Sequence, residues 1–436
     1  SARPAVASSH ILRGFLPARN RASRFPISSS TPPRCLPDLP NTSPHHNTTQ
    51  AFTMAYTPPS SAKPFTLHIP DQDLSEWRQL LQLSKLGPRT FENTQTKDNF
   101  GVTYDWLSSA KDHWLNTYDW RAQEAHINSF PNYKMAIDDI DMHFVALFSP
   151  KKDAIPILFL HGWPGSFIEF LPLVAQLQKK FEGKDLPYHI IVPSLPGYTL
   201  SSGGPLERDW TTLDSAAVME KLMRGLGFDK YFVQGGDVGS FLCRIMAARY
   251  ESVVGVHLNL YSTATQPERE KLSNIEIEAY DRAQAFQKIG TAYAQEHATR
   301  PSTIGHVLSS SPLALLAWIG EKFIEWTDET PPLDVILTNI SLYWFTGGFP
   351  RSIYPYRTLF RGAREPLPPL TKPTGFSFFP KELFPGIKYI IENETNLVSF
   401  AAHERGGHFG ALERPEDLWG DVEEFVAKVT ENGSKL

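Results

Sequence analysis

Short apolar runs alternate with amphipathic stretches through the middle of the chain. Runs rich in β-branched and aromatic residues predict buried strands, and apolar residues spaced three and four apart predict helices between them. Strands that alternate with helices favour a mainly parallel sheet with helices on both faces. The predicted strands are Ile155–Leu160, His189–Val192, Tyr231–Gln234 and Val253–Leu260, and the predicted helices are Phe167–Lys179, one capped by Thr212 or Asp214 that runs to Gly225 or Gly227, and Ser240–Tyr250.

Other patterns lie on either side of residues 151–265, which hold this alternation. Residues 58–150 mix strand-like and helical stretches, whereas residues 266–360 are helical without strands and predict an inserted lid. The sheet pattern resumes within residues 361–436, the second part of the core. The further elements predicted are strands over Phe65–Pro70, Phe144–Phe148, Pro373–Phe379 and Ile387–Glu392, and helices over Asp71–Leu86, Ser311–Trp326, Asp334–Trp344 and Leu418–Val429.

The first 57 residues differ in composition from the rest. They contain six arginines, no lysine and no acidic residue before Asp38, and Ser, Thr, Pro and Asn dominate. Such a segment cannot bury a core, and we expect it to be largely disordered. An Arg-rich segment poor in acids is also typical of a mitochondrial transit peptide. A third interpretation is a non-native extension upstream of a true start at Met54.

Composition narrows the class of protein. The chain has 436 residues, 41% of them hydrophobic and 20% charged, as in a globular protein with a large core. A net charge of −5 gives no reason to expect nucleic-acid binding. Cys35 and Cys243 are the only cysteines, which argues against a disulfide scaffold and favours a reducing compartment such as the cytoplasm. No apolar run reaches the roughly 18 residues of a membrane helix.

A glycine-rich turn joins the predicted strand Tyr231–Gln234 to the helix that follows it. Gly235 and Gly239 flank Gly236-Asp237-Val238, which is the small-x-nucleophile-x-small pattern of an α/β-hydrolase nucleophile elbow with Asp in place of Ser. The glycines suit a sharp turn at which backbone segments approach closely. An ordinary glycine-rich strand–helix turn would have the same local sequence, so the interpretation needs partner residues elsewhere.

Those partners occur in the expected order along the chain. His161-Gly-Trp-Pro-Gly-Ser166, Gly236-Asp237, Phe379-Pro-Lys-Glu382 and Gly406-Gly-His408 together resemble the epoxide hydrolases of the microsomal and fungal type over about residues 60–430. This resemblance implies an α/β-hydrolase fold with an N-terminal region, residues 58–150, that wraps around the core. It also implies conversion of epoxides to diols without a cofactor or metal.

The chemistry of the elbow can be argued from the residue types. A carboxylate is ionised at neutral pH, so Asp237 needs no base before it attacks a strained ring and forms an ester. His408 is then the candidate base that activates water to hydrolyse this ester; a loop histidine on the surface is the simpler alternative. A zinc site at His403-Glu404 and His408 is disfavoured, because the spacing is one residue too long for H-E-x-x-H and two glycines intervene.

Further candidates complete the predicted site. Glu382 is expected to orient His408, with Glu392 and Glu394 as rivals. The backbone N–H groups of Trp163 and Val238 are expected to stabilise the oxyanion. The resemblance implies that two lid tyrosines assist ring opening, at positions matched by Tyr293 and Tyr356; Tyr280 and Tyr354 are their nearest competitors, and packed lid aromatics are the structural alternative.

Two other classes remain open at this stage. A haloalkane dehalogenase uses the same Asp–His–acid set, with tryptophan donors for the halide, and Trp163 leaves it open. A non-catalytic α/β-hydrolase used as a binding protein would usually lack a member of the triad. The expected substrate is a small apolar or aryl epoxide. The resemblance to soluble fungal relatives implies no stable membrane anchor and a homodimer.

Overall fold

The computed structural model describes residues 55–96, 100–360 and 369–431. In this part of the chain, nine strands form one sheet in the order β1-β2-β3-β5-β4-β6-β7-β8-β9. Pairings from β1 to β5 are antiparallel, and those from β5 to β9 are parallel, which confirms the predicted fold class. The strands are β1 (Lys63–Pro64), β2 (Asn132–Ile137), β3 (Ile140–Leu147), β4 (Ile155–Leu160), β5 (Tyr188–Pro193), β6 (Tyr231–Gly235), β7 (Val253–Leu258), β8 (Leu370–Phe378) and β9 (Thr395–Ala402).

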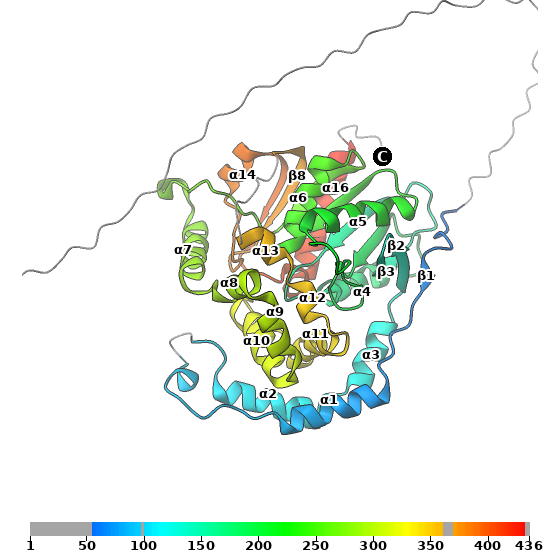
Figure 1. The fold of residues 1–436 in the computed structure, drawn as a ribbon. Coiled ribbons are helices and arrows are strands. Elements are labelled where there is room, and N and C mark those ends of the chain that lie inside the picture. The colour runs from blue at the N-terminus through cyan, green and yellow to red at the C-terminus, as the bar shows by residue number, and fades with distance from the viewer. Residues whose placement is uncertain (1–54, 97–99, 361–368, 432–436) are drawn as a thin grey trace, which may run out of the picture. The chain divides into compact units, whose positions relative to one another are not determined.

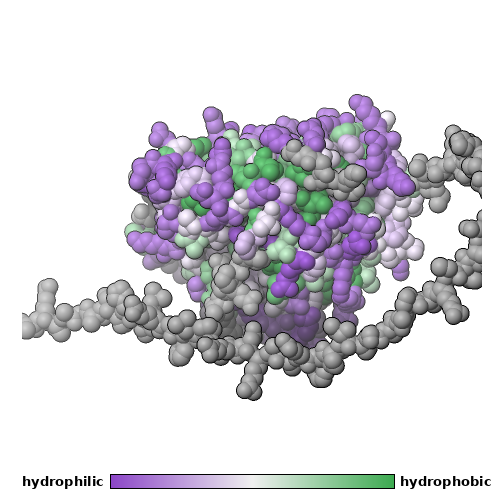
Figure 2. All heavy atoms as spheres, turned by 90° about the horizontal axis from the view of Figure 1, so that it is seen from above, coloured by the Kyte–Doolittle hydropathy of each residue, from purple (hydrophilic) through white to green (hydrophobic). Residues whose placement is uncertain are grey.

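Helices cover both faces of this sheet (Figure 1). Helices α4 and α16 contact each other on one face, and α5 and α6 contact each other on the other. Hydrophilic side chains cover much of the surface in Figure 2, with smaller hydrophobic areas between them. The helices of the sheet are α4 (Leu171–Lys180), preceded by the 3-10 helix η2 (Phe167–Phe170), α5 (Thr212–Gly225), α6 (Asp237–Arg249), α14 (Lys388–Glu394), α15 (Gly410–Glu413) and α16 (Pro415–Glu431).

A helical segment lies between β7 and β8, as predicted for the lid. Its described residues contain no strand. Helix α9 contacts its chain neighbours α8 and α10, while α12 contacts α9 and α13 contacts α8. Its helices are α7 (Asn274–Ile289), α8 (Ala292–Thr299), α9 (Pro301–Ser309), α10 (Pro312–Glu325), α11 (Leu333–Phe345), α12 (Phe349–Ser352) and α13 (Pro355–Phe360), with the 3-10 helix η3 (Arg269–Lys271) before them.

Residues before β4 contact both the sheet and the lid. Strands β1 to β3 extend one sheet edge, while α1 and α2 contact α10, and α3 contacts α11 (Figure 1). Tyr56 packs its ring against Phe148, His189 and Phe228, whereas residues 1–54 lie outside the described residues. The helices are α1 (Asp71–Leu83), α2 (Tyr104–Asn116) and α3 (Trp120–Asn128), with the 3-10 helix η1 (Glu92–Thr94).

The predicted strand over Phe65–Pro70 is wrong. This segment alternates in hydrophobicity, but its backbone bonds mainly to side chains of α3 instead of to a neighbouring strand. Asn128 Oδ1 accepts the N–H of Leu67 at 2.8 Å, and Asn128 Nδ2 donates to the Leu67 carbonyl at 2.8 Å. Glu124 accepts the N–H of Ile69 at 2.6 Å. The alternation therefore reflects an extended segment with one face on the core.

Two other local predictions need correction. Residues Ile387–Glu392 do not form a strand: Ile387 precedes helix α14, and the last strand is β9. The short apolar run was compatible with either element, because periodicity alone does not separate them. The cap of α5 is Thr211, not Thr212 or Asp214, and Asp214 serves as the acidic partner in its capping box.

Among the described residues, no single helix is long and apolar enough to cross a membrane. The bent pair α9 and α10 passes by length and composition alone.

We predict that Asn128→Ala destabilises the fold by about 1–3 kcal/mol, because it removes two hydrogen bonds that tie the Leu67 backbone to α3. Urea unfolding measures this change. Gln79→Ala is the matched control, since it removes only an exposed bond to Ser75 and is expected to change stability by less than about 0.5 kcal/mol. Equal stabilities of the two variants would contradict the assignment.

Candidate active site

The turn between β6 and α6 brings Asp237 to the carboxyl edge of the sheet. Asp237 is the first residue of α6 and has a φ of 44°, an uncommon conformation for a residue with a side chain. A Cβ on Gly239 would lie 2.1 Å from the carbonyl oxygen of Leu160, at the end of β4. A Cβ on Gly235 would lie 2.6 Å from the Gly239 backbone. The turn therefore requires both predicted glycines.

The backbone of the loop after β4 contacts the Asp237 carboxyl. The N–H of Trp163 donates to Asp237 Oδ1 at 2.7 Å. The N–H of Val238 lies in the first turn of α6, where helix N–H groups have no partner within the helix. His161 supports the loop: its Nε2 accepts the N–H of Leu195 at 3.1 Å, and its Nδ1 lies 3.0 Å from the Gly162 carbonyl.

His408 lies between two carboxylates. Its Nε2 is 3.3 Å from Asp237 Oδ2, and its Nδ1 is 2.8 Å from Glu382 Oε1. The Glu382 side chain is fully buried and that of His408 is 2% exposed, whereas Asp237 retains 22% exposure. The structure thus brings together the three predicted residues Asp237, His408 and Glu382 in the order that a nucleophile, a base and an orienting acid require.

The two carboxylates set the protonation of His408. Burial is the largest single influence and lowers its pKa, but the charge of Glu382 and the hydrogen bond and charge of Asp237 outweigh burial. The net effect raises the pKa of His408 well above its usual value. The charged, imidazolium form of His408 is therefore favoured in the free protein.

The lid tyrosines lie next to this set. Tyr293 stacks on the ring of Trp163 at 5.4 Å between centroids, and Tyr356 meets the same ring edge-on at 5.8 Å. The two phenol rings are 5.6 Å apart. Burial raises the pKa of both phenols, and the Asp237 charge raises both further, so each phenol keeps its proton in the free protein.

The four residues that competed for these roles have other hydrogen-bond or ion-pair partners. Tyr354 bonds to Ser215 at 2.7 Å, and Tyr280 donates to Gln266 at 2.7 Å. Glu394 accepts bonds from Tyr261 and two threonines, which lowers its pKa although burial opposes this. Glu392 faces Lys388, at 3.8 Å, on the surface of α14. None of these four residues contacts His408 or Asp237 in the described part of the chain.

Two residues near the site carried no signal in the sequence analysis. Lys322 is 4% exposed, and its ammonium lies 4.6 Å from the centroid of the Tyr293 ring, where a cation favours negative charge on a phenol. Glu169 lines a cavity with Asp237 and His408. Lys322 faces the site because a helix distant in sequence packs there. Glu169 follows the predicted loop by three residues and matches the local pattern of a capping box with Ser166, which does not itself indicate the site.

The described residues contain no group of three or more His, Cys, Asp or Glu side chains that could hold a metal ion. His403, part of the sequence pattern considered for zinc, bonds to Asp421 at 2.7 Å and stacks on Phe379. The imidazoles of His403 and His408 therefore have different partners.

The chain is similar to two family models and to several known proteins. Residues 62–170 match the family model "Epoxide hydrolase N terminus", and residues 155–269 match "alpha/beta hydrolase fold". A putative epoxide hydrolase of Dothistroma septosporum is 40% identical and covers 86% of this chain and 92% of its own. Epoxide hydrolase 1 of Sus scrofa is 31% identical over 84% of this chain and 88% of its own. The structure of Aspergillus niger epoxide hydrolase is 47% identical with a TM-score of 0.82, and covers 86% of this chain and all of that one.

We predict that Gly239→Ala lowers stability by about 1–3 kcal/mol and activity by about 100-fold, because its methyl group displaces the turn that carries Asp237. Thermal unfolding and turnover measure the two effects. Gly420→Ala is the control: its Cβ meets nothing within 4 Å, so this helical change is expected to stabilise by about 0.5–1 kcal/mol. Wild-type behaviour of Gly239→Ala would argue against the close approach.

Proposed function

The chain belongs to the epoxide hydrolase family, and on that premise we propose that it converts epoxides and water to vicinal diols through an ester on Asp237. The observation that carries the proposal is the contact series Trp163 N–H, Asp237, His408 and Glu382, with distances of 2.7, 3.3 and 2.8 Å. A nucleophile, a base, an orienting acid and an oxyanion donor are all within reach of one reacting atom.

In the first step, Asp237 Oδ2 attacks one carbon of the ring. The new C–O bond forms as the bond from that carbon to the ring oxygen breaks, and the ring oxygen takes a proton from Tyr293 or Tyr356. The raised pKa of both phenols keeps this proton available before the reaction. Asp237 Oδ1 stays on the Trp163 N–H, which leaves it as the carbonyl oxygen of the ester.

In the second step, water attacks the ester carbonyl carbon. His408 Nε2 takes the proton that the water loses, and the oxyanion develops on Oδ1, within reach of the N–H groups of Trp163 and Val238. Collapse of this intermediate breaks the bond to the substrate, releases the diol and restores the Asp237 carboxylate. His408 passes its first proton to the phenolate left by ring opening, so the proton that it then takes from the water restores the imidazolium of the free protein.

Ester formation also prepares the base. Asp237 loses its negative charge when it becomes an ester, and that charge is one cause of the raised pKa of His408. The pKa of His408 therefore falls when the ester forms. Loss of the imidazolium proton to the phenolate left by ring opening is therefore easier once the ester has formed, and the neutral ring then acts as the base.

The indole N–H of Trp163 is buried with no hydrogen-bond partner among the described residues. Such a donor could hold a halide, as a haloalkane dehalogenase requires. The tyrosine pair favours an epoxide instead, so we expect diol from an aryl epoxide and no halide from a haloalkane. A small apolar or aryl epoxide substrate, a cytoplasmic location and a homodimer remain proposals from the resemblance.

We predict that a single turnover in heavy-oxygen water, with the enzyme in excess, gives unlabelled diol and labelled Asp237. The reason is that water attacks the ester carbonyl, so its oxygen enters the enzyme first. Peptide mass spectrometry locates the label. Labelled diol in the first turnover would contradict the ester.

His408→Gln sharpens this test. Ester formation does not need the base but hydrolysis does, so this variant should accumulate an adduct of substrate mass on the peptide that contains Asp237. Asp237→Asn, which removes the nucleophile, is the control and should show no adduct.

We further predict that Tyr293→Phe and Tyr356→Phe each slow ring opening by about 10- to 100-fold, and that the double variant nearly abolishes it, because each change removes one donor to the alkoxide. Tyr354→Phe is the matched control, since its hydroxyl bonds to Ser215. Stopped-flow measurement of ester formation separates ring opening from hydrolysis. Normal turnover by the double variant would refute the tyrosine assignment.

A further inference from the structure

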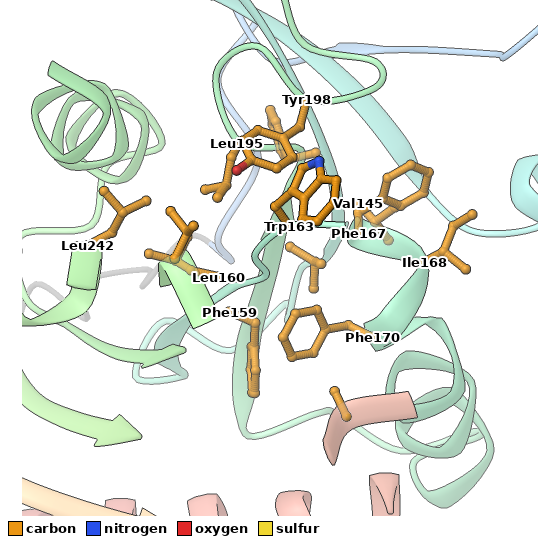
Figure 3. Close-up of a cluster of buried hydrophobic side chains, with 14 of the residues drawn as sticks. Val145, Phe159, Leu160, Trp163, Phe167, Ile168, Phe170, Leu195, Tyr198 and Leu242 are labelled. Carbon is orange, nitrogen blue, oxygen red and sulfur yellow. The ribbon is translucent and has the colours of Figure 1, made fainter. Parts of the chain in front are cut away.

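Glu169 is an acid beside the nucleophile that the two steps above leave unused. It lies in the 3-10 helix η2, and its carboxyl occupies the space of a missing side chain, because a Cβ on Gly165 would lie 1.4 Å from Glu169 Oε1. Phe167 and Phe170 of the same turn are buried, and Phe170 packs on Phe159 of β4 at 5.5 Å (Figure 3). The core thus fixes the backbone that carries Glu169.

A small cavity joins Glu169 to the reacting groups. Asp237, His408 and Asn259 line it, together with the loop after β4. The volume that the centre of a water molecule can occupy in this cavity is about 10 Å³, which is enough for one water molecule. Its polar lining satisfies the second condition for holding water, since several hydrogen-bonding groups face one space.

The charges of these groups affect one another. The pKa of Glu169 is raised to about 8, chiefly by burial, while the His408 charge lowers it and the Asp237 charge raises it. The charge on Asp237 disappears when the ester forms, so one cause of the raised pKa disappears with it. Loss of a proton from His408 at the same stage removes the charge that lowers this pKa, so the two changes oppose each other. Glu169 can accept an O–H through a carboxyl oxygen in either protonation state.

We propose that Glu169 is a positioning residue for the hydrolytic water. Its carboxyl oxygen accepts a hydrogen bond from one O–H of the water, and the proton of the other O–H passes to His408. This inference rests on the proposed ester on Asp237. The water oxygen bonds to the ester carbonyl carbon, the lost proton moves to His408 Nε2, and the carbonyl electrons move to the oxygen held by Trp163. Glu169 keeps its own protonation state and directs the lone pair of the water at the carbon.

A structural role is the alternative explanation. Ser166-x-x-Glu169 has the sequence of a capping box, and the Ser166 backbone lowers the pKa of Glu169 through a hydrogen bond. A residue that only caps η2 would affect stability and both chemical steps together. A residue that positions water would affect ester breakdown and leave ester formation unchanged. The kinetic difference between the two steps therefore distinguishes the roles.

The test follows formation and decay of the ester in single turnovers of an aryl epoxide, by quenched flow and intact-protein mass. Glu169→Met has nearly the same size and no oxygen acceptor, so we expect breakdown about 30-fold slower than wild type, with formation within about threefold. Glu169→Gln keeps a weaker, neutral acceptor, so we expect breakdown about three- to tenfold slower. Glu182→Gln on the surface is the control and should match wild type.

Each outcome decides the assignment. Breakdown at the wild-type rate in both Glu169→Met and Glu169→Gln, or an equal loss in both steps, overturns the role of Glu169. If Glu169→Met does not fold, a wild-type breakdown rate in Glu169→Gln is sufficient to overturn it. If His408→Gln forms no ester at all, the proposed nucleophile fails instead, and this result is distinct from any behaviour of the Glu169 variants.

Discussion

The site depends on the close approach of two neighbouring turns. Strands β4 and β6 are parallel partners, so the turns after them leave the sheet side by side. Only glycine at position 239 lets helix α6 start against the Leu160 carbonyl, and only glycine at 162 leaves room for Asp237, whose Oδ1 would lie 2.1 Å from an added Cβ. A side chain at either position would separate the nucleophile from the N–H of Trp163.

Burial and charge together set the pKa values of the groups around Asp237. Burial raises the pKa of the lid phenols and of Glu169, and the charge of Asp237 raises all three further. The Asp237 charge is also one cause of the raised pKa of His408. In the proposed mechanism, esterification removes that charge and lowers the pKa of His408, which is the direction that hydrolysis needs.

The sequence was sufficient where the constraint is local. The elbow glycines, the position of Asp237 in the turn and the loop from His161 to Ser166 follow from short motifs, because close backbone approach allows few residue types. The extended segment at Phe65–Pro70 and the helix at Lys388–Glu394 were missed, because side chains of α3 in one case and tertiary packing in the other decide the local structure. Lys322 could not be assigned to the site, because its neighbours come from distant parts of the chain. Glu169 was missed although it follows the predicted loop, because its spacing from Ser166 is also that of a helix cap.

The N-terminal region and the lid hold the site in place although their contacts lie away from the nucleophile. Helix α11 bonds to the loop after β4 at three points: Asn339 donates to the Pro164 carbonyl and accepts from Ser166, and Tyr343 donates to the Gly165 carbonyl. The region before β4 holds α11 in turn, through Tyr118 with Thr338 and His113 with Asp334. The lid also supports the base, because the Trp326 carbonyl accepts the N–H of His408. A change in the N-terminal helices would therefore shift α11 and, through it, the loop that carries the Trp163 N–H. The N-terminal region thus supports the site although it supplies no reacting group.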